Sequence, residues 1–330
     1  MDEKGRLRYP PSLFIKLPMV NTNATDIDDT AGLENDLKCL WNIEVNFYEV
    51  FGNKDLGLFR IPRVYLVENR TTLEDGCFVF EDMGSTDKEV FSEEYVPGFS
   101  LDQVKKIVAG LAELHYHCLS DKDQSWRSRC DVPVDVIDNF CSVLWGLASK
   151  LKTYDPTGIG QKLDKIQSHY TLDYCFEGRH GYKNSGLPPV LIHQDLNSTN
   201  ILWTKRNGQK EISAFIDFQM STVGSICEDM VRVLSLGMCA EDRRRYTDCV
   251  LEEYHNSVSF LFNGKPPYTL KQVKDEYYRV FSSANNFTIF GISCYYGQCK
   301  EEKLPADVKH QKLTEYLNRA SGIIDDILAL

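Results

Sequence analysis

The stretch "VLIHQDLNSTNILW", residues 190–203, places polar side chains between two apolar runs. The polar residues are His193, Asp195, Asn197 and Asn200, and the runs on either side are strand-like in composition. Such a stretch is either a polar surface turn between two strands or a set of reactive groups held on a rigid base. The sequence that follows favours the second interpretation.

A second motif follows at the distance of one β-hairpin. Residues 201–216, "ILWTKRNGQKEISAFI", have a strand–turn–strand pattern, and Asp217 comes directly after them. Because a hairpin folds back on itself, the loop before its first strand and the residue after its second strand lie at the same end. We therefore expect Asp195, Asn200 and Asp217 to converge. Two carboxylates and an amide oxygen form the kind of site that Mg²⁺ prefers.

This set of oxygen ligands is typical of phosphoryl transfer to a hydroxyl group. In that chemistry one aspartate accepts the hydroxyl proton, while an asparagine and a second aspartate hold the metal ion on the nucleotide phosphates. We predict Asp195 as the catalytic base and Asn200 and Asp217 as the Mg²⁺ ligands. His193 is predicted to brace the loop backbone. Asp229, in "ICEDMVRVL", is either a charge at a helix N-terminus or a buried carboxylate that anchors this loop.

The chain upstream of these motifs predicts a small lobe built on a sheet. Runs of apolar and β-branched residues predict three short strands, at residues 12–18, 63–69 and 77–83. Apolar residues recur at helical intervals over 34–51, so one amphipathic helix is expected between the first two strands. After Met83 the pattern becomes helical, and we place the end of this lobe there.

The rest of the chain predicts a larger, mainly helical lobe. Helices are expected at residues 100–119, 134–152 and 159–170, the first capped by Ser100, and further helices toward the C-terminus. We therefore predict an α+β fold with two lobes. The N-lobe, residues 1–83, would bind the nucleotide, and the C-lobe, residues 84–330, would carry the catalytic loop, the metal site and the substrate-binding helices.

Lys16 and Glu44 are candidates for a nucleotide-phosphate clamp. Lys16 lies inside an apolar strand, where an ammonium group costs free energy unless anions such as phosphate oxygens surround it. Otherwise it is an exposed residue of an edge strand. Glu44 on the following helix is placed to hold Lys16 in an ion pair, and Glu34 and Glu49 are rivals for this role.

The stretch "FVFEDMG" is a candidate for contact with the base of a nucleotide. It ends a predicted strand at the change from sheet to helix. Glu81, Asp82 and Met83 would offer backbone groups to a purine there, although the stretch is also compatible with an ordinary linker.

With these residues identified, the chain resembles the small-molecule members of the protein-kinase-like phosphotransferases. "LIHQDLNSTNILW" resembles the catalytic loop of aminoglycoside phosphotransferases and choline kinases. "FIDFQ" followed by "EDMVRVL" resembles the CHK kinase-like (ecdysteroid kinase-like) family, and "LFIKLP", "NIEVNFYE" and "FVFEDMG" stand where that family keeps its lysine strand, glutamate helix and hinge. The resemblance covers essentially the whole chain.

The resemblance implies a bilobal, protein-kinase-like fold and an ATP- and Mg²⁺-dependent kinase that phosphorylates a hydroxyl group of a small molecule. It implies Asp195 as the catalytic base, Asn200 and Asp217 as Mg²⁺ ligands, and Lys16 with Glu44 as the clamp on the ATP phosphates. Gln219 takes the place of the glycine in the familiar protein-kinase motif and has no assigned role.

The spacing after Asp217 argues against a protein substrate. Glu228 comes only eleven positions later, and a helix starts there, so the gap is too short for an activation segment and a peptide-docking platform. The extra length lies instead between residues 119 and 190. In the small-molecule kinases that the chain resembles, this region helps to build the substrate pocket.

The N-terminus departs from the pattern of these kinases, in which two strands and a phosphate-covering loop precede the lysine strand. Only fifteen residues precede Lys16, with Gly5 as their single glycine. At about 3.3 Å per residue they supply the lysine strand and little more. We therefore expect an N-lobe that lacks the first strands and the glycine-rich loop.

Two alternative functions stay open. A catalytically weak or inactive kinase-like protein that binds a small molecule is compatible with the short N-terminus, but it has no need of the intact Asp195, Asn200 and Asp217. A metal-dependent hydrolase would use the same carboxylates, but it leaves Lys16 and "FEDM" without a purpose. The substrate is not specified: the aromatic residues of 285–297, "NNFTIFGISCYYG", suit a sterol pocket, a cage for a quaternary amine, or a helical core.

The composition limits other classes of function. The chain has 330 residues and a net charge of −11, which argues against non-specific nucleic-acid binding because that needs clustered positive charge. No apolar run of about 18 residues and no signal peptide occur, so no membrane insertion is expected. Eleven scattered cysteines without C-x-x-C spacing indicate reduced thiols. We expect a cytoplasmic protein.

Overall fold

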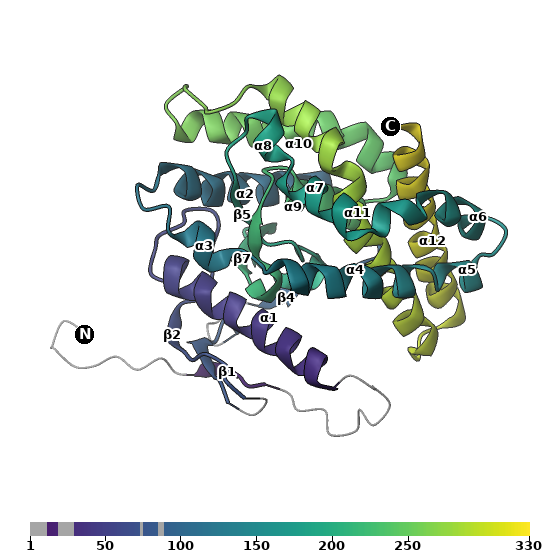
Figure 1. The fold of residues 1–330 in the computed structure, drawn as a ribbon, viewed down its shortest axis with the longest axis horizontal. Coiled ribbons are helices and arrows are strands. Elements are labelled where there is room, and N and C mark those ends of the chain that lie inside the picture. Colours follow the sequence, from purple (N-terminus) through teal and green to yellow (C-terminus); the bar gives the residue numbers. More distant parts are fainter. Residues whose placement is uncertain (1–11, 19–29, 73–74, 85–88) are drawn as a thin grey trace, which may run out of the picture.

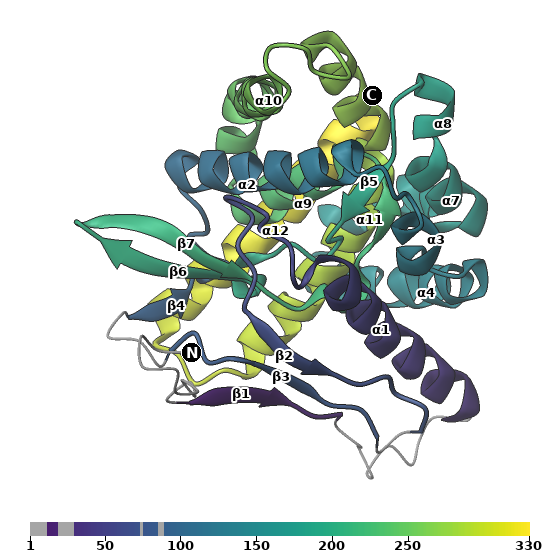
Figure 2. The ribbon, with the colours of Figure 1, turned by 90° about the vertical axis from the view of Figure 1, so that its left-hand side faces the viewer.

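A small lobe at the start of the chain has one long helix over an antiparallel sheet (Figure 1). The computed structural model describes residues 12–18, 30–72, 75–84 and 89–330. The elements of this lobe are β1 (Leu13–Lys16), α1 (Thr30–Phe51), β2 (Val64–Val67) and β3 (Phe78–Glu81). The strands lie in the order β1, β3, β2, and α1 crosses one face of the sheet (Figure 2).

Aromatic residues join α1 to this sheet. The ring of Trp41 lies 4.6 Å from that of Phe78, and the ring of Tyr48 lies 4.9 Å from that of Phe80, measured between centroids. Trp41 and Tyr48 are seven positions apart, which puts them on the same face of a helix. The predicted helix and the three predicted strands are therefore present, with α1 starting four residues earlier than expected.

The expected shortage of strands before Lys16 falls mainly on residues 1–11, which lie outside the described residues. It therefore stays a prediction, as does the boundary between the lobes at Met83.

Short strands of the larger lobe form the frame of the opening stretch. Their bounds are β4 (Val90–Ser92), β5 (Val190–Ile192), β6 (Ile201–Arg206), β7 (Gln209–Phe215) and β8 (Thr222–Gly224). β4, β6 and β7 make one antiparallel sheet, and β5 pairs with β8 in another. β4 was not predicted: three residues carry too little periodicity to mark a strand.

The predicted hairpin is present and has a tight turn. Arg206 pairs with Gln209, and Asn207 and Gly208 between them both have positive φ angles, of 51° and 79°. This conformation matches the right-handed twist of the two strands. At the other end of the hairpin Ile201 pairs with Phe215, so the residues just outside the hairpin are neighbours, as predicted.

Helices make up most of the larger lobe. Their bounds are α2 (Leu101–Ser120), α3 (Trp126–Cys130), α4 (Val134–Ala148), α5 (Leu151–Tyr154), α6 (Ile159–Leu163), α7 (Leu172–His180), α8 (Tyr182–Ser185), α9 (Glu228–Gly237), α10 (Ala240–Leu261), α11 (Leu270–Glu301) and α12 (Ala306–Ala329). Three 3₁₀ turns complete the lobe: η1 (Asp164–Tyr170), η2 (Ser198–Asn200) and η3 (Phe218–Met220).

Three of the predicted helical regions illustrate what local sequence does and does not encode. Ser100 caps α2 as predicted, and it forms a reciprocal capping box with Gln103. By contrast, the region predicted as a helix over 134–152 divides after Ala148 into α4 and α5, and the one predicted over 159–170 ends as a 3₁₀ turn.

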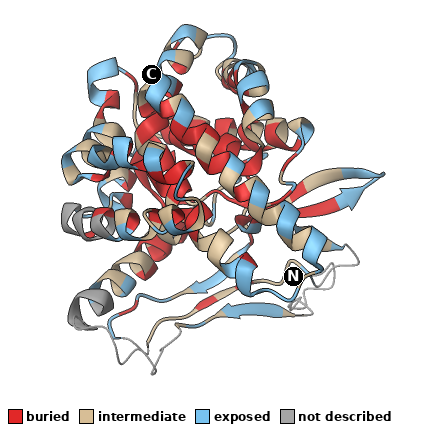
Figure 3. Cartoon of the chain, turned by 90° about the vertical axis from the view of Figure 1, so that its right-hand side faces the viewer, coloured by how far each residue is buried: buried red, intermediate tan, exposed pale blue. Residues whose placement is uncertain are grey.

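Every residue of α9 is buried, and the buried residues gather in the centre of the larger lobe (Figure 3). The sheet of the small lobe is more exposed, with β1 almost entirely open on its described surface. Phe47 of α1 and Phe218 of η3 stack with centroids 3.6 Å apart and join the two lobes. Together these features are the predicted α+β, bilobal, protein-kinase-like fold. In the described part of the chain, no helix is long and apolar enough to cross a membrane.

Candidate active site

The candidate catalytic loop begins where β5 ends. Asp229 of α9 holds it by hydrogen bonds to its backbone. The Asp229 carboxylate is fully buried and accepts the backbone N–H groups of His193 at 2.7 Å and of Gln194 at 2.8 Å. Burial raises the pKa of this carboxyl, and the two N–H groups oppose the rise. Of the two sequence interpretations, the anchoring one is correct.

His193 braces the loop as predicted. Its Nε2 lies 2.9 Å from the carbonyl oxygen of Ile216, and its ring packs on Phe218 with centroids 4.8 Å apart. Gln194 has a φ of 66°, a conformation that is strained for a residue with a side chain. The hydrogen bond from the Gln194 N–H to Asp229 therefore holds a strained turn immediately before Asp195.

Asp195 is held by two partners on opposite sides. Asn200 Nδ2 donates to the Asp195 carbonyl oxygen at 2.9 Å and to Oδ2 at 3.3 Å. Arg232 Nη2 donates to Oδ1 at 2.7 Å. The predicted convergence of Asp195 and Asn200 is therefore present, and Arg232 is an addition that the sequence did not predict.

Lys16 lies between two carboxylates. Its Nζ is 2.6 Å from Glu44 Oε2 and 2.8 Å from Asp217 Oδ1. Burial disfavours the ammonium charge, but Glu44 and Asp217 outweigh it and raise the pKa of Lys16 above its ordinary value. Lys16 is thus a fixed cation rather than an exposed edge-strand residue. The rival Glu49 pairs with Arg129 instead.

Asp217 owes its position to distant contacts. It comes two residues after β7 and has a φ of 67°, in the left-handed region. Lys16 holds its carboxylate, and the next residue, Phe218, is stacked on Phe47. The backbone N–H of Ile216 donates to the carbonyl oxygen of Asn200 at 3.1 Å, which ties the two ends of the hairpin together. The predicted approach of Asn200 and Asp217 follows from this geometry.

A cavity of about 660 Å³ lies beside this group and is called here the N-lobe cavity. Seven of the eight predicted site residues line it: Lys16, Glu44, Glu81, Asp82, Met83, Asn200 and Asp217. Apolar side chains of both lobes complete the wall: Phe14, Tyr48, Pro62, Phe80, Val90, Leu202 and Ile216. The eighth residue, Asp195, is not part of this wall, but its carboxylate is hydrogen-bonded to the lining residue Asn200.

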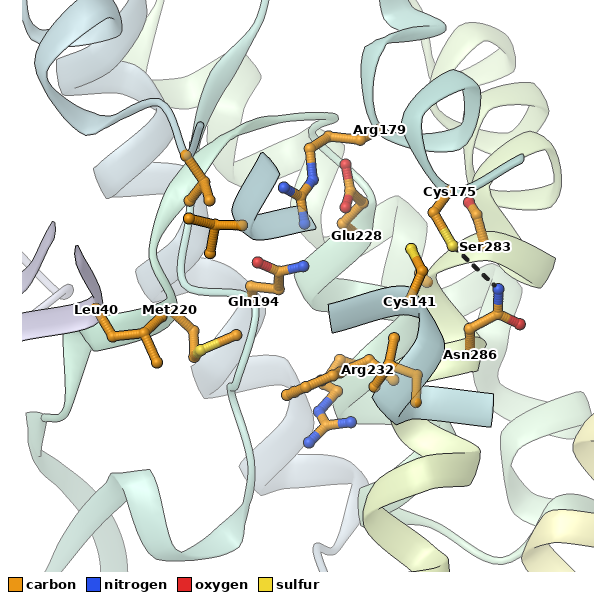
Figure 4. Close-up of a pocket in the computed structure, with 15 residues that line it drawn as sticks. Leu40, Cys141, Cys175, Arg179, Gln194, Met220, Glu228, Arg232, Ser283 and Asn286 are labelled. Atoms are coloured by element: carbon orange, nitrogen blue, oxygen red, sulfur yellow. Dashed lines mark hydrogen bonds between the residues drawn. The ribbon is translucent and has the colours of Figure 1, made fainter. Parts of the chain in front are cut away.

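A second cavity, of about 70 Å³, is lined mainly by residues of the larger lobe and is called here the C-lobe cavity (Figure 4). Residues from α4, α7, α9 and α11 form most of its wall, together with Leu40, Gln194 and Met220. Its wall includes Arg232, the other partner of Asp195. Asp195 is not among the lining residues of either cavity, but it contacts one lining residue of each, Asn200 and Arg232.

Sequence reasoning missed two further residues near Asp195. Asn197, left without a role, caps η2 through Thr199, and its Oδ1 lies 3.3 Å from the hydroxyl of Tyr95. Arg232 is 2% exposed and lies over the ring of Phe287 at 4.4 Å. Its signal was present in the sequence, as a lone arginine inside the apolar run "MVRVLSL". A charged residue inside an all-apolar helix needs a buried partner.

A lysine–glutamate ion pair in the small lobe, an ion pair from the same lysine to an aspartate of the larger lobe, and a buried, anchored loop define a kinase-like protein. A family model, DUF1679, described as "Uncharacterized oxidoreductase dhs-27", matches residues 13–330. The chain belongs to the DUF1679 family. It is 29% identical over 322 residues to the "Uncharacterized kinase-like protein D1044.1" of Caenorhabditis elegans, which covers 96% of this chain and 84% of that protein.

Two other similarities are weaker. The "Uncharacterized oxidoreductase dhs-27" of Caenorhabditis elegans is 24% identical over 269 residues, or 78% of this chain, and the chain spans only 31% of that protein. An ethanolamine kinase of Plasmodium vivax superposes with a TM-score of 0.48 at 15% identity, over 94% of this chain and 77% of that structure. At this score the likeness has no bearing on the function of the chain.

Proposed function

We propose that this protein is a phosphotransferase that moves a phosphoryl group from ATP, with Mg²⁺, to a hydroxyl group of a small molecule. The observation that carries the proposal is the contact of Asp195 with a lining residue of each cavity. Asn200 of the N-lobe cavity and Arg232 of the C-lobe cavity both donate to its carboxylate, which supports a role for Asp195 next to both binding spaces.

The N-lobe cavity suits a nucleotide in size and in charge. Its volume of about 660 Å³ is within the usual range of ligand pockets, roughly 300–1,000 Å³. An ammonium group has three donors, and the two carboxylates on Lys16 take two of them, which leaves one for a phosphate oxygen. We assign Lys16 and Glu44 as the phosphate clamp, and the backbone of Glu81–Met83 as the contact to the purine.

Asn200 and Asp217 suit a magnesium ion. The side-chain N–H groups of Asn200 point to Asp195. This leaves the side-chain carbonyl oxygen of Asn200 for a cation. Asp217 Oδ2 has only a long contact of 3.4 Å with Gln219 Nε2. Two protein oxygens are enough, because Mg²⁺ in such sites takes its remaining ligands from phosphates and water. When bound, ATP with Mg²⁺ supplies the phosphoryl group and screens its charge.

Asp195 is assigned as the base for the substrate hydroxyl. The hydroxyl oxygen of the substrate forms a bond to the terminal phosphorus of ATP while the bond from this phosphorus to the leaving ADP breaks. The hydroxyl proton passes to Asp195. Arg232 holds Oδ1 at 2.7 Å, and Oδ2 is held less closely, at 3.3 Å from Asn200. We therefore assign Oδ2 as the oxygen that accepts the proton.

The segment after Asp217 supports a small molecule rather than a protein as the acceptor. Between Asp217 and α9 the chain forms η3 and β8, and β8 pairs with β5 beneath the loop. The segment is therefore used in the core and presents no peptide-docking platform in the described part of the chain. The 29% identical relative, a kinase-like protein by name, supports the same general class.

A kinase-like binding protein without activity is the second candidate. One observation favours it: Lys16 holds Oδ1 of Asp217, so one oxygen of the proposed metal ligand is already engaged. The family description names an oxidoreductase. This chain spans only 31% of that protein, so the name describes a protein most of which this chain does not match.

Thermal unfolding with ATP, with and without Mg²⁺, separates these candidates. We expect ATP with Mg²⁺ to stabilise the chain and to be consumed once a hydroxyl compound from a screening library is accepted, as measured by ADP release. Asp217→Asn should lose most of the Mg²⁺-dependent stabilisation, whereas Asp195→Asn should keep it. Absence of any stabilisation of the unchanged protein by ATP and Mg²⁺ would refute the kinase proposal. Stabilisation without ADP release across the library would favour the binding protein.

A further inference from the structure

Two thiols lie next to each other on the wall of the C-lobe cavity. Cys141 comes from α4 and Cys175 from α7, and both residues line the cavity. A hydrogen bond joins the two thiols, and Figure 4 shows them side by side. They are 34 positions apart in the sequence, so it is the packing of α4 against α7 that brings them together.

An amide group also points to Cys175. Asn286 Nδ2 donates to Cys175 Sγ at 3.6 Å, the contact that is dashed in Figure 4. The same nitrogen donates to the carbonyl oxygen of His169 at 2.6 Å, which fixes the orientation of the amide because only its NH₂ group can donate. The Cys175 thiol has a longer contact with this carbonyl oxygen, at 3.7 Å. Two donors, the Asn286 amide and the Cys141 thiol, are therefore directed at the Cys175 sulfur.

These donors favour the ionised form of Cys175. The hydrogen bond from Cys141 lowers the pKa of Cys175 below its ordinary value; burial opposes this change, and the N–H of Asn286 adds to it. By contrast, burial raises the pKa of the Cys118 and Cys130 thiols to about 12. Because the thiolate is the reactive form of cysteine, Cys175 is a better nucleophile at neutral pH than these two buried thiols.

The size of the cavity limits which oxidant can reach this sulfur. Its volume of about 70 Å³ has room for about five water molecules at ~10–15 Å³ each. Hydrogen peroxide is little larger than water and fits in this space, whereas a branched peroxide fills it and a peptide disulfide exceeds it. Cys175 is half-buried and Cys141 is buried, so a small oxidant meets Cys175 first.

We propose that Cys141 and Cys175 are an oxidation site at which hydrogen peroxide converts the two thiols into a disulfide. The Cys175 sulfur attacks one peroxide oxygen, so that an S–O bond forms, the O–O bond breaks and a first water leaves. The Cys141 sulfur then attacks the Cys175 sulfur: an S–S bond forms, the S–O bond breaks, and a second water leaves with the Cys141 proton. Two thiols are oxidised, and one peroxide is reduced to two water molecules.

The disulfide would tie α4 to α7 within the wall of the C-lobe cavity. A dithiol reverses it by thiol–disulfide exchange. The proposal needs neither a nucleotide nor phosphoryl transfer, so it stands or falls independently of the phosphotransferase function proposed above.

Peptide mapping of the full chain tests the proposal. The reduced protein is treated with an equimolar amount of hydrogen peroxide, the remaining thiols are alkylated in denaturant, and mass spectrometry identifies linked peptides without reduction. We expect a link between Cys141 and Cys175 before any other, with a mass loss of about 2 Da for the two hydrogen atoms removed. Another cysteine pair linked first, or no link at all, overturns the proposal.

Serine variants separate the roles of the two thiols. Cys141→Ser keeps a donor to Cys175 but removes the second sulfur, so we expect Cys175 to accumulate as a sulfenic acid that dimedone traps. Cys175→Ser removes the first attack and should slow oxidation of Cys141 about tenfold or more. Cys249→Ser, in α10 and away from the described wall of the cavity, is the matched control and should form the link at an unchanged rate. Oxidation of Cys141 at an unchanged rate in Cys175→Ser would contradict the proposed order.

Two rate comparisons test the surroundings of Cys175. Asn286→Asp keeps the shape of the side chain but replaces the N–H donor by an oxygen, so disulfide formation should need a higher pH and be about threefold or more slower at pH 7. Tert-butyl hydroperoxide, with both peroxides scaled to their rates with free cysteine, should react about tenfold or more slowly than hydrogen peroxide because it fills the cavity. An unchanged pH dependence in Asn286→Asp, or equal scaled rates for the two peroxides, overturns the proposal.

Discussion

The N-lobe and C-lobe cavities differ in how their charged groups are balanced. In the N-lobe cavity, Lys16 is already paired with Glu44 and Asp217, so its charges are organised before any ligand arrives. Around the C-lobe cavity, the described side chains leave polar atoms of both kinds unpaired: N–H groups of Arg179 and Arg232 lack an acceptor, and the amide oxygen of Asn286 lacks a donor. The charged groups of the first cavity are therefore already paired, whereas several polar atoms around the second are not.

The same difference separates what local sequence reveals from what it hides. Seven of the eight predicted residues line the N-lobe cavity, and they come from strands, a hairpin and one helix with clear local patterns. The wall of the C-lobe cavity is gathered from four helices that are distant in sequence, and none of its residues was predicted as a site residue. The variants below test this contrast, from the largest expected effect to the smallest.

The largest effect on turnover is expected from Asp195, which contacts one lining residue of each cavity. We expect Asp195→Asn to lower turnover of an accepted alcohol about 10³-fold or more, because an amide cannot take the hydroxyl proton, while ATP affinity changes little. Initial rates of ADP release measure this. Asp307→Asn, in the exposed first turn of α12, is the matched control and should keep full activity. A rate for Asp195→Asn within a few-fold of the unchanged protein would show that the cavities do not share a base.

The anchor beneath the loop comes next. Asp229→Ala leaves the N–H groups of His193 and Gln194 without their buried acceptor, and each such bond to a charged group contributes roughly 1.5–3 kcal/mol. The free energy of unfolding, from denaturant titration, should fall by roughly 3–5 kcal/mol. Asp229→Asn keeps one acceptor oxygen and should lose less. If the alanine variant lost under about 1 kcal/mol, the loop would be held by its strands and not by Asp229.

Glu228 tests the C-lobe cavity through pH. Its pKa is about 7 in the folded protein and near the ordinary 4.5 in the unfolded chain. Its contribution to stability is fully present below pH 4.5 and is lost as the pH rises toward 7, because the buried carboxyl must then ionise. Glu228→Gln removes this loss, so its advantage over the unchanged protein should grow across that window to at most about 3 kcal/mol. Parallel pH dependence of unfolding in the two proteins would contradict this account.

The smallest effect concerns the internal pairing of the N-lobe cavity. A double-mutant cycle with Lys16→Met and Glu44→Gln should give a coupling energy of roughly 2 kcal/mol from unfolding titrations, because Glu44 is buried and Lys16 only 27% exposed at its side chain. The exposed pair Lys271 and Asp275 is the control, at about 0.3–0.5 kcal/mol. Equal coupling in both pairs would mean that the clamp is not preformed.

The sequence by itself determined the hairpin and the groups at its ends. The Asn207–Gly208 turn and the alternation of the strands fix a local register, which places Asn200 and Asp217 at the same end of the hairpin. The helix of Glu44 and the strand of Lys16 were likewise readable from local periodicity. The division of the chain into a sheet lobe and a helical lobe followed from the same patterns.

Only the tertiary structure decided where Arg232 points and that Asp229 is an anchor. α9 is buried on every side, so each of its side chains meets other parts of the protein, and its own sequence does not say which of them Arg232 contacts. Its contact with Asp195 joins residues 37 positions apart, and the wall of the C-lobe cavity joins residues more than a hundred positions apart. Such contacts depend on how whole helices pack against each other, and local spacing does not encode that packing.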